Sequence, residues 1–245
     1  MILFIPVFEK GLILKQHMLE ALRDYPRELT KNLFCEYGSG IITGCNISVS
    51  ENVLSVGEGI VKINGEVYIL TKPLSVNAED EINYVYLKIT SESLADGTNL
   101  QIEVIQKNEK NDNLFEMARY TKNAVLKPYN KIEELFSDVS NRIDQRYVLQ
   151  SVAGGNTLLS GYYRLYGEKV LSGVNADMQD IAFAYQCLNG IGSIEIVKAY
   201  FHTDDISNQN ILSLMKQRLS TLSAKSPEIK KSEPAQVKKP MTIIY

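Results

Sequence analysis

Apolar residues near the start of the chain recur at helical spacing. Between residues 14 and 25 they stand three or four positions apart, which places them on one face of a helix. We expect this helix to end at Pro26, which can in turn open a second helix. The two predicted faces comprise Leu14, Met18, Leu22 and Tyr25, and then Leu29, Leu33 and Tyr37. The pattern predicts an N-terminal helical docking segment over residues 1–40.

The apolar period changes to two in the stretch "GCNISVSENVLSVGEGIVKINGEVYIL", residues 44–70. Apolar side chains alternate with polar ones four times, and turn residues separate the runs, as expected for short strands. The dipeptide Asn64-Gly65 is the strongest hairpin signal, because a type I′ turn needs positive φ at both central residues. The stretches "YVYLKIT" and "LQIEVIQ", joined through "ADGTN", predict two longer strands. We expect an antiparallel β-module, a small sandwich or barrel, over residues 41–127.

Glycines cluster where this module begins. The stretch "YGSGIITG" ends at Gly44 and is expected to form a loop that leads into the β-module. The residues predicted to serve as structural turns are Gly40, Gly44, Gly59, Asn64 and Gly65.

A helical period returns after residue 130. Apolar positions from Ile132 to Tyr147 step by three or four, which predicts an amphipathic connector helix of about four turns within residues 128–152. The stretch "AGGN" marks a joint, and residues 153–223 are expected to form a bundle of three or four helices. The apolar positions of these helices are Leu158, Tyr162, Tyr166, Met178, Ile181, Tyr185, Leu188, Ile211, Met215, Leu219 and Leu222. The predicted fold class is therefore α+β.

The last segment, residues 224–245, differs in composition from the rest. It holds five Lys, two Glu and three Pro and has no apolar period before residue 241, so it is expected to be an extended linker. It ends in the apolar, β-prone pentapeptide "MTIIY". This pentapeptide can fold back on its own domain, or it can add a strand to an exposed sheet edge of a neighbouring subunit. The predicted docking residues are Met241, Ile243, Ile244 and Tyr245.

Composition narrows the function classes. The 245 residues are 44% hydrophobic and 22% charged, with a formal net charge of −3, so no overall basic field favours nucleic acid as the main partner. The N-terminal apolar run lacks a basic flank, and the chain has no apolar stretch of about 18 residues, so we expect a cytoplasmic protein without membrane insertion. The three cysteines are not spaced as metal ligands and are expected to be buried free thiols.

Candidate catalytic groups are few. His17 lies in the first helical run and is expected on its surface. His202 neighbours Asp204 and Asp205, but no further residues converge on them in the sequence pattern. The glycines of "GSGIITGC" lack the lysine of a phosphate-binding loop, and no G-x-S-x-G elbow occurs. We therefore expect no enzyme, no cofactor and no metal, with an enzyme built on His202 as the remaining enzymatic hypothesis.

Two further groups have non-catalytic interpretations. The adjacent acids Glu133 and Glu134 lie on a predicted helix and point apart, as solvated residues do. In the "YYRLY" stretch, Tyr162 and Tyr166 share a helix face with apolar neighbours, so core or interface packing is favoured over stacking on a sugar or base.

Residues 8–70 resemble the N-terminal regions of proteins encoded in phage and phage-tail-like bacteriocin gene clusters. In those proteins a D-G-I-x-x-G junction precedes a β-module with a v-x-x-G-I-x-x-x-n-G-x-i-Y phrase. The matching residues are Ser39-Gly40-Ile41 with Gly44, then Gly59-Ile60, and then Asn64-Gly65 with Val67-Tyr68. Serine replaces the aspartate of the junction, and the resemblance covers about a quarter of the chain.

This resemblance implies a structural part of a phage or phage-tail-like (contractile) particle. Such a part belongs to the baseplate region and connects the tail to receptor-binding or fibre proteins by protein–protein docking, in several copies within a symmetric assembly. The implied location is the particle, assembled in the bacterial cytoplasm. The alternative is a cell-surface, carbohydrate-binding module of the same particle, which would use the β-module or the Tyr-rich stretch.

Overall fold

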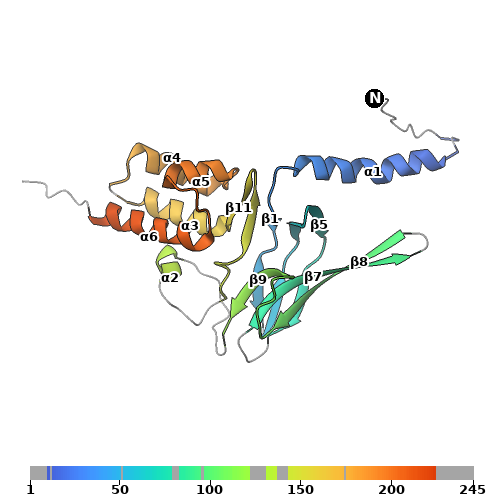
Figure 1. The fold of residues 1–245 in the computed structure, drawn as a ribbon, viewed down its shortest axis with the longest axis horizontal. Helices are drawn as coiled ribbons and strands as arrows, with labels where there is room; N and C mark the ends of the chain where they lie inside the picture. The colour runs from blue at the N-terminus through green and yellow to red at the C-terminus, as the bar shows by residue number, and fades with distance from the viewer. Residues whose placement is uncertain are drawn as a thin grey trace, which may run out of the picture.

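The chain forms a β-sheet part and a helical part that lie side by side (Figure 1). The structure is a computed structural model and describes residues 10–11, 13–50, 52–78, 83–94, 97–121, 131–136, 143–173 and 175–224. The helices are α1 (Gln16–Leu33), α2 (Ile132–Phe136), α3 (Ser160–Leu171), α4 (Met178–Asn189), α5 (Ile194–Phe201) and α6 (Asn208–Ala224). The strands are β1 (Gly40–Gly44), β2 (Ile47–Ser50), β3 (Val53–Val56), β4 (Gly59–Ile63), β5 (Glu66–Leu70), β6 (Leu74–Asn77), β7 (Asn83–Leu94), β8 (Gly97–Lys107), β9 (Phe115–Tyr120), β10 (Leu149–Val152) and β11 (Gly155–Leu158).

The strands form three small sheets. One sheet has five strands in the order β11-β10-β1-β4-β5, and the other two have the orders β2-β3-β6 and β8-β7-β9. All pairings between these strands are antiparallel except that of β1 with β10, which is parallel. The α+β class is confirmed. The expected antiparallel sandwich or barrel is not what the described residues form, because β1 pairs with a strand from beyond residue 127.

Two apolar cores correspond to the two parts. The β core collects residues from β1, β3, β4, β7 and β9, including Leu54, Val61 and Met117. The helical core is built around Tyr163 and Tyr166 of α3 and includes residues of all the helices from α2 to α6. Leu159 packs against both cores.

Glycines allow β1 to approach β10 closely. A Cβ atom on Gly40 would lie 2.7 Å from the carbonyl oxygen of Leu149 and from the amide nitrogen of Ser151. Next to it, the Gly38 amide donates to the Gly155 carbonyl at 2.8 Å, and the Ser151 hydroxyl donates to the Gly38 carbonyl at 2.6 Å. This contact, which we call the glycine seam, joins the N-terminal β strands to the helical part.

The N-terminal region holds one helix where two were predicted. Helix α1 continues through Pro26, so the prediction that the helix ends there was wrong. Proline removes one backbone donor, and on an exposed helix the freed carbonyl is accessible to water. The Thr30 hydroxyl donates to the Pro26 carbonyl at 2.8 Å on the same surface. The two predicted apolar faces therefore merge into one.

The predicted hairpins are confirmed. Asn64 and Gly65 have φ angles of 52° and 86° and connect β4 to β5, as a type I′ turn requires. β7 and β8 pair along their whole length, from Leu94 opposite Gly97 to Tyr84 opposite Lys107. The stretch "GSGIITGC" was wrongly predicted as a loop, because its residues 40–44 form β1 in the interior of the five-stranded sheet.

The predicted four-turn connector helix is wrong. Only α2 is helical, and residues 137–142 lie outside the described part of the chain. Beyond them, Asp144 and Arg119 exchange backbone hydrogen bonds of 2.8 and 2.7 Å, which a helix could not form. The Tyr147 ring then lies 3.6 Å from the Arg119 guanidinium carbon, and this cation–π contact keeps the segment against β9.

C-terminal helices are present: α3 to α6, where three or four were predicted. They are preceded by a β10–β11 hairpin that was not predicted, and Leu158, predicted to lie on a helix, is the last residue of β11. The "AGGN" joint is the turn of that hairpin, with Gly154 at φ 82°. Gly190, at φ 93°, ends α4. All three cysteines are free; Cys45 and Cys187 are buried as predicted, whereas Cys35 is exposed. Burial raises the pKa of the Cys45 thiol to about 11.

The glycine seam leads to a stability prediction. In Gly40→Ala the new methyl group would meet backbone atoms that cannot move without separating β1 from β10. We expect the free energy of unfolding, measured by urea titration, to fall by about 3 kcal/mol or more. The control is Gly161→Ala in α3, where a Cβ atom has no neighbour within 4 Å. For Gly161→Ala we expect unchanged or slightly higher stability. Equal effects of the two changes would contradict the requirement for glycine at position 40.

Candidate docking surfaces

Helix α1 carries a line of exposed apolar side chains. At 100° per residue they lie within about 120° of the helix circumference. We call these residues the α1 stripe: Leu19, Leu22, Tyr25, Leu29 and Leu33. Their side chains are 46–62% exposed, a large fraction for residues of this type. In Figure 1, α1 extends away from the sheets, and its main contact with the described body is at β5.

Lys62 of β4 holds the base of α1. Its ammonium group is buried and donates to the carbonyl oxygens of Phe34 at 2.6 Å, Tyr37 at 2.7 Å and Cys35 at 3.2 Å. These acceptors lie just beyond the C-terminal end of α1, where backbone carbonyls lack helical partners and a positive charge is favourable. One side chain therefore caps the helix and attaches it to the five-stranded sheet.

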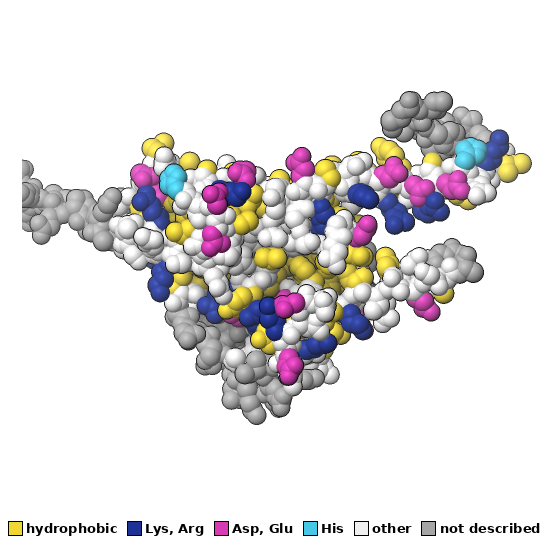
Figure 2. Space-filling view, in the orientation of Figure 1, with side chains coloured by type: hydrophobic (Ala, Val, Ile, Leu, Met, Phe, Trp, Pro, Cys, Tyr) yellow, Lys and Arg dark blue, Asp and Glu magenta, His cyan; other side chains and the backbone are white. Residues whose placement is uncertain are grey.

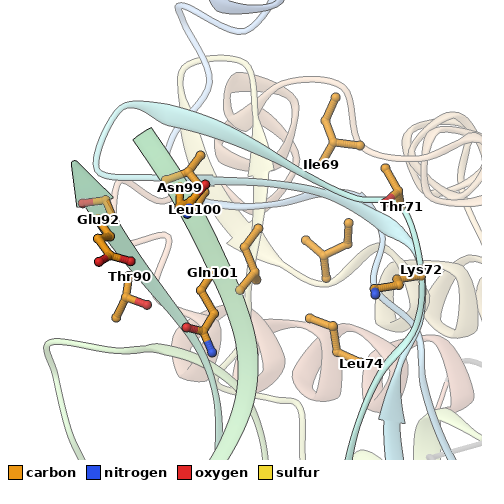
Figure 3. A pocket seen from close by; sticks show the side chains of 12 residues that line it. Ile69, Thr71, Lys72, Leu74, Thr90, Glu92, Asn99, Leu100 and Gln101 are labelled. Carbon is orange, nitrogen blue, oxygen red and sulfur yellow. The ribbon is translucent and has the colours of Figure 1, made fainter. Parts of the chain in front are cut away.

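A groove lies between the β5–β6 connection and the hairpin arm, which we define as residues 88–103 of β7 and β8. Its volume is about 680 Å³. Figure 3 shows Ile69 and Leu74 on one side of the groove and Leu100 and Gln101 on the other. Ile69 and Leu100 are 56% and 57% exposed. Because β5 and β8 are edge strands of different sheets, two strand edges border this groove.

Helix α1 and the hairpin arm project from the same end of the molecule (Figure 1). Figure 2 shows apolar side chains in the hollow between α1 and the hairpin arm, with acidic and basic side chains along α1. Fourteen large apolar side chains are exposed in the described residues, and ten of them lie on residues 13–33, β5 and the hairpin arm region. Exposed apolar side chains thus gather on elements at one end of the molecule instead of being scattered singly.

The strongest polar cluster is internal. Asp180 of α4 is fully buried and accepts hydrogen bonds from the Tyr200 hydroxyl at 2.6 Å and from the Arg218 guanidinium at 2.7 and 2.8 Å. The Asp177 amide donates to its second oxygen at 3.0 Å. Burial opposes ionisation of Asp180, but the bonds from Arg218 and Tyr200 outweigh it and lower the pKa of the carboxyl group. This cluster braces α4, α5 and α6 and leaves neither carboxylate oxygen free for a substrate.

Some of the predicted turn residues lie in a turn, and others lie in strands. Asn64 and Gly65 form a turn, whereas Gly40 and Gly59 lie within strands and Gly44 ends β1 with φ 69°. A Cβ atom on Gly59 would lie 2.5 Å from the Cys45 amide nitrogen, so this glycine permits a close strand contact.

The histidines are placed apart. His17 is exposed on α1, and His202 ends α5 in the left-handed conformation. The carboxylate of Asp205 accepts from the Ser207 amide at 3.0 Å, which lowers the pKa of Asp205. Within the described residues no group of three or more His, Cys, Asp or Glu is arranged to hold a metal ion.

The tyrosines of "YYRLY" belong to the helical core. Tyr162 and Tyr166 are buried, as predicted, and the Tyr166 hydroxyl pairs with that of Tyr200 at 2.9 Å. Glu133 on α2 pairs with Lys169 at 2.6 Å on the surface, and this contact lowers the pKa of the glutamate. The predicted docking residues Met241, Ile243, Ile244 and Tyr245 lie outside the described residues.

No protein-family model matches the chain, and no curated protein matches its sequence. Three solved structures are distantly similar. In "Crystal structure of TssK" the matched chain is 11% identical with a TM-score of 0.32, and the match covers 90% of this chain and 56% of that one. In the cryo-electron microscopy structure of the type VI secretion system TssK-TssF-TssG baseplate subcomplex, identity is 10% and the TM-score 0.40, over 89% of this chain and 99% of that one. In "The baseplate complex from the type VI secretion system", identity is 10% and the TM-score 0.34, over 89% and 100%.

This chain therefore spans 56% of the first TssK chain and nearly the full length of the other two matched chains. Similarity at these TM-scores assigns neither a family nor a function. In the described part of the chain, no helix combines the length and hydrophobicity needed to cross a bilayer.

The Lys62 cap can be tested by Lys62→Met, which keeps the length of the side chain but leaves three carbonyls without their donor. We expect a loss of about 2–3 kcal/mol in the free energy of unfolding. Amide hydrogen exchange should accelerate across residues 16–37. Lys88→Met is the control, because Lys88 forms a partly exposed ion pair with Glu103 at 2.7 Å and its loss should cost at most about 1 kcal/mol. Equal protection of α1 in both variants would contradict the cap.

The Asp180 cluster predicts a pH-dependent stability. Because its pKa is lowered on folding, ionised Asp180 stabilises the protein above about pH 4, and this contribution is lost as the pH falls through the folded-state pKa. We expect Asp180→Asn to cost about 2–3 kcal/mol in urea unfolding at pH 7. The difference from wild type should shrink between about pH 5 and pH 2. Asp112→Asn, at an exposed carboxylate, should show no such trend.

Proposed function

We propose that the chain is a structural component of the baseplate region of a phage or phage-tail-like particle, connecting the tail to fibre or receptor-binding proteins by protein–protein docking. The observation that carries the docking role is the gathering of exposed apolar side chains on the α1 stripe and around the groove. A soluble protein that works alone seldom exposes a contiguous apolar surface, whereas an assembly component buries it against its neighbours.

The place in the particle is supported by the sequence resemblance of residues 8–70. The residues that carry it, among them Gly40, Gly59 and Asn64-Gly65, form the core strands and hairpin of the β part. The cytoplasmic assembly of the particle and its multi-copy arrangement belong to the same proposal.

We assign the groove to the C-terminal pentapeptide 241–245 of a neighbouring subunit. Two strand edges border the groove, and its walls offer Ile69, Leu74 and Leu100 to an apolar extended segment. The pentapeptide is apolar and β-prone, so strand addition would supply both main-chain hydrogen bonds and side-chain contacts. The linker of residues 225–240 can span about 50 Å when extended, which is enough to reach a neighbouring molecule.

The alternative carbohydrate-binding role loses one of its two candidate surfaces. Tyr162 and Tyr166 are buried in the helical core, so they are not exposed to stack on a sugar ring. No observation on the β part favours sugar over protein as its ligand.

The experiment is mass spectrometry of particles purified from a producing strain. We expect the wild-type chain to be present at fixed stoichiometry. Deletion of residues 241–245 removes the docking segment, and Leu100→Asp would bury an unpaired carboxylate in the groove. Each change should therefore reduce the amount of the chain in the particles by roughly tenfold or more. Tyr185→Asp is the matched control, since Tyr185 is 57% exposed on α4, the same fraction as Leu100 on the hairpin arm.

Absence of the wild-type chain from particles would overturn the proposed function. Equal incorporation of all four chains would instead overturn the assignment of the groove to the C-terminal pentapeptide.

A further inference from the structure

Within the described residues, the α1 stripe is largely uncovered. Leu22 and Tyr25 are 49% and 62% exposed, although Met18 on the same arc is buried, and the main packing of α1 on the described body is at β5. We propose that a second copy of the chain covers this surface, with two α1 helices packed stripe against stripe. This inference names the partner of one docking surface and rests on the proposed docking function.

The spacing of the stripe suits helix-on-helix packing. From Leu19 to Leu33 there are four steps of three, three, four and four residues, a mean of 3.5. This is the period that keeps an apolar seam facing a partner helix. The helix has 18 residues and is therefore about 27 Å long, which is two and a half heptads. Ala21 borders the seam with a small side chain, and the uncharged Pro26 lies within its arc, between Leu33 and Leu19 in projection.

The charges of α1 do not oppose self-association. Three acidic residues, Glu20, Asp24 and Glu28, are each followed three positions later by a basic residue. The basic residues are Arg23, Arg27 and Lys31. These charges cancel within each helix, and all six lie outside the arc of the stripe, so two copies would meet through a neutral seam. The stripe therefore has no net charge that would attract a charged partner.

The area is sufficient for a dimer. A fully exposed Leu offers about 120 Å² of apolar surface and a Tyr about 200 Å². At the exposed fractions given above, the stripe offers about 370 Å² per helix, or about 750 Å² for two. Since interface cores are about 65% apolar, the total buried area would be about 1,150 Å². With the stripe fully covered, this reaches the roughly 1,000 Å² expected of a specific interface.

A pair of this kind is a closed assembly. The same surface is used on both copies, so the contact is self-complementary and ends at two subunits. Each subunit keeps its groove and helical part available for other neighbours. A baseplate component of this kind would dimerise through α1 and attach to the particle through its remaining surfaces.

The test is the mass of the purified full chain by sedimentation velocity between about 1 and 100 µM. Wild type, a 27.6 kDa chain, should sediment as a dimer at the upper concentrations. The double variant Leu22→Ala, Leu29→Ala should dimerise about 100- to 1,000-fold more weakly. The matched control Arg27→Ala, Lys31→Ala changes the opposite face and should stay within about threefold of wild type. Alanine favours the helix in both cases, and circular dichroism checks that α1 persists.

The C-terminal arm could also link copies, so the same measurement is made after deletion of residues 241–245. Pairing through α1 predicts that the dimer survives this deletion. A wild-type chain that is monomeric throughout, equal weakening by the two double variants, or dissociation caused by the deletion alone would each overturn the inference. The last result would leave the proposed arm–groove contact intact, and particle content tests the proposed function separately.

A second variant set tests the geometry directly. In a Cys35→Ser background, Tyr25→Cys places a thiol in the seam and Arg27→Cys places one on the opposite face. A short bismaleimide should link two chains efficiently through the first and poorly through the second. Equal linking through both positions would contradict stripe-to-stripe packing.

Discussion

The close approach of β1 to β10 is the constraint on which the two-part architecture depends. These strands are more than 100 residues apart in the chain, and the side chain of Gln150 donates to the Ile42 carbonyl across that separation at 3.0 Å. Backbone atoms of β10 occupy the space that a Cβ atom on Gly40 would need. Without glycine at this position the five-stranded sheet would divide, and the helical part would lose its attachment to the β strands that carry α1.

Buried and half-buried charged side chains hold secondary-structure elements together. Lys62 caps α1, Asp180 and Arg218 join α4 to α6, and Arg119 lies against the rings of Tyr84 and Tyr147 at 5.0 and 3.6 Å. Each of these charges has its partners inside the protein, as buried charges must. The large apolar side chains that remain exposed in the described residues lie mainly on residues 13–33, β5 and the hairpin arm.

Local sequence signals predicted local structure well. The Asn64-Gly65 turn and the long β7–β8 hairpin depend on residues close in sequence, so their spacing was enough to find them. Pro26 and Tyr147 show where such signals fail. The segment around Tyr147 has a helical pattern, but it packs against Arg119 of β9 instead of forming a helix. Pro26 does not end α1, because this helix is exposed and water can reach the carbonyl that proline leaves without a donor.

The sequence by itself determined the α+β class, the alternation of the β part, the buried tyrosines and the amphipathic character of residues 14–33. It could show that this N-terminal face is apolar, since periodicity is a local property. Only the tertiary structure decided that β1 joins a strand from beyond residue 127 and that the α1 stripe remains exposed. Burial depends on which distant segments meet, and a one-dimensional pattern of apolar positions is the same whether the core lies in the same molecule or in the next one.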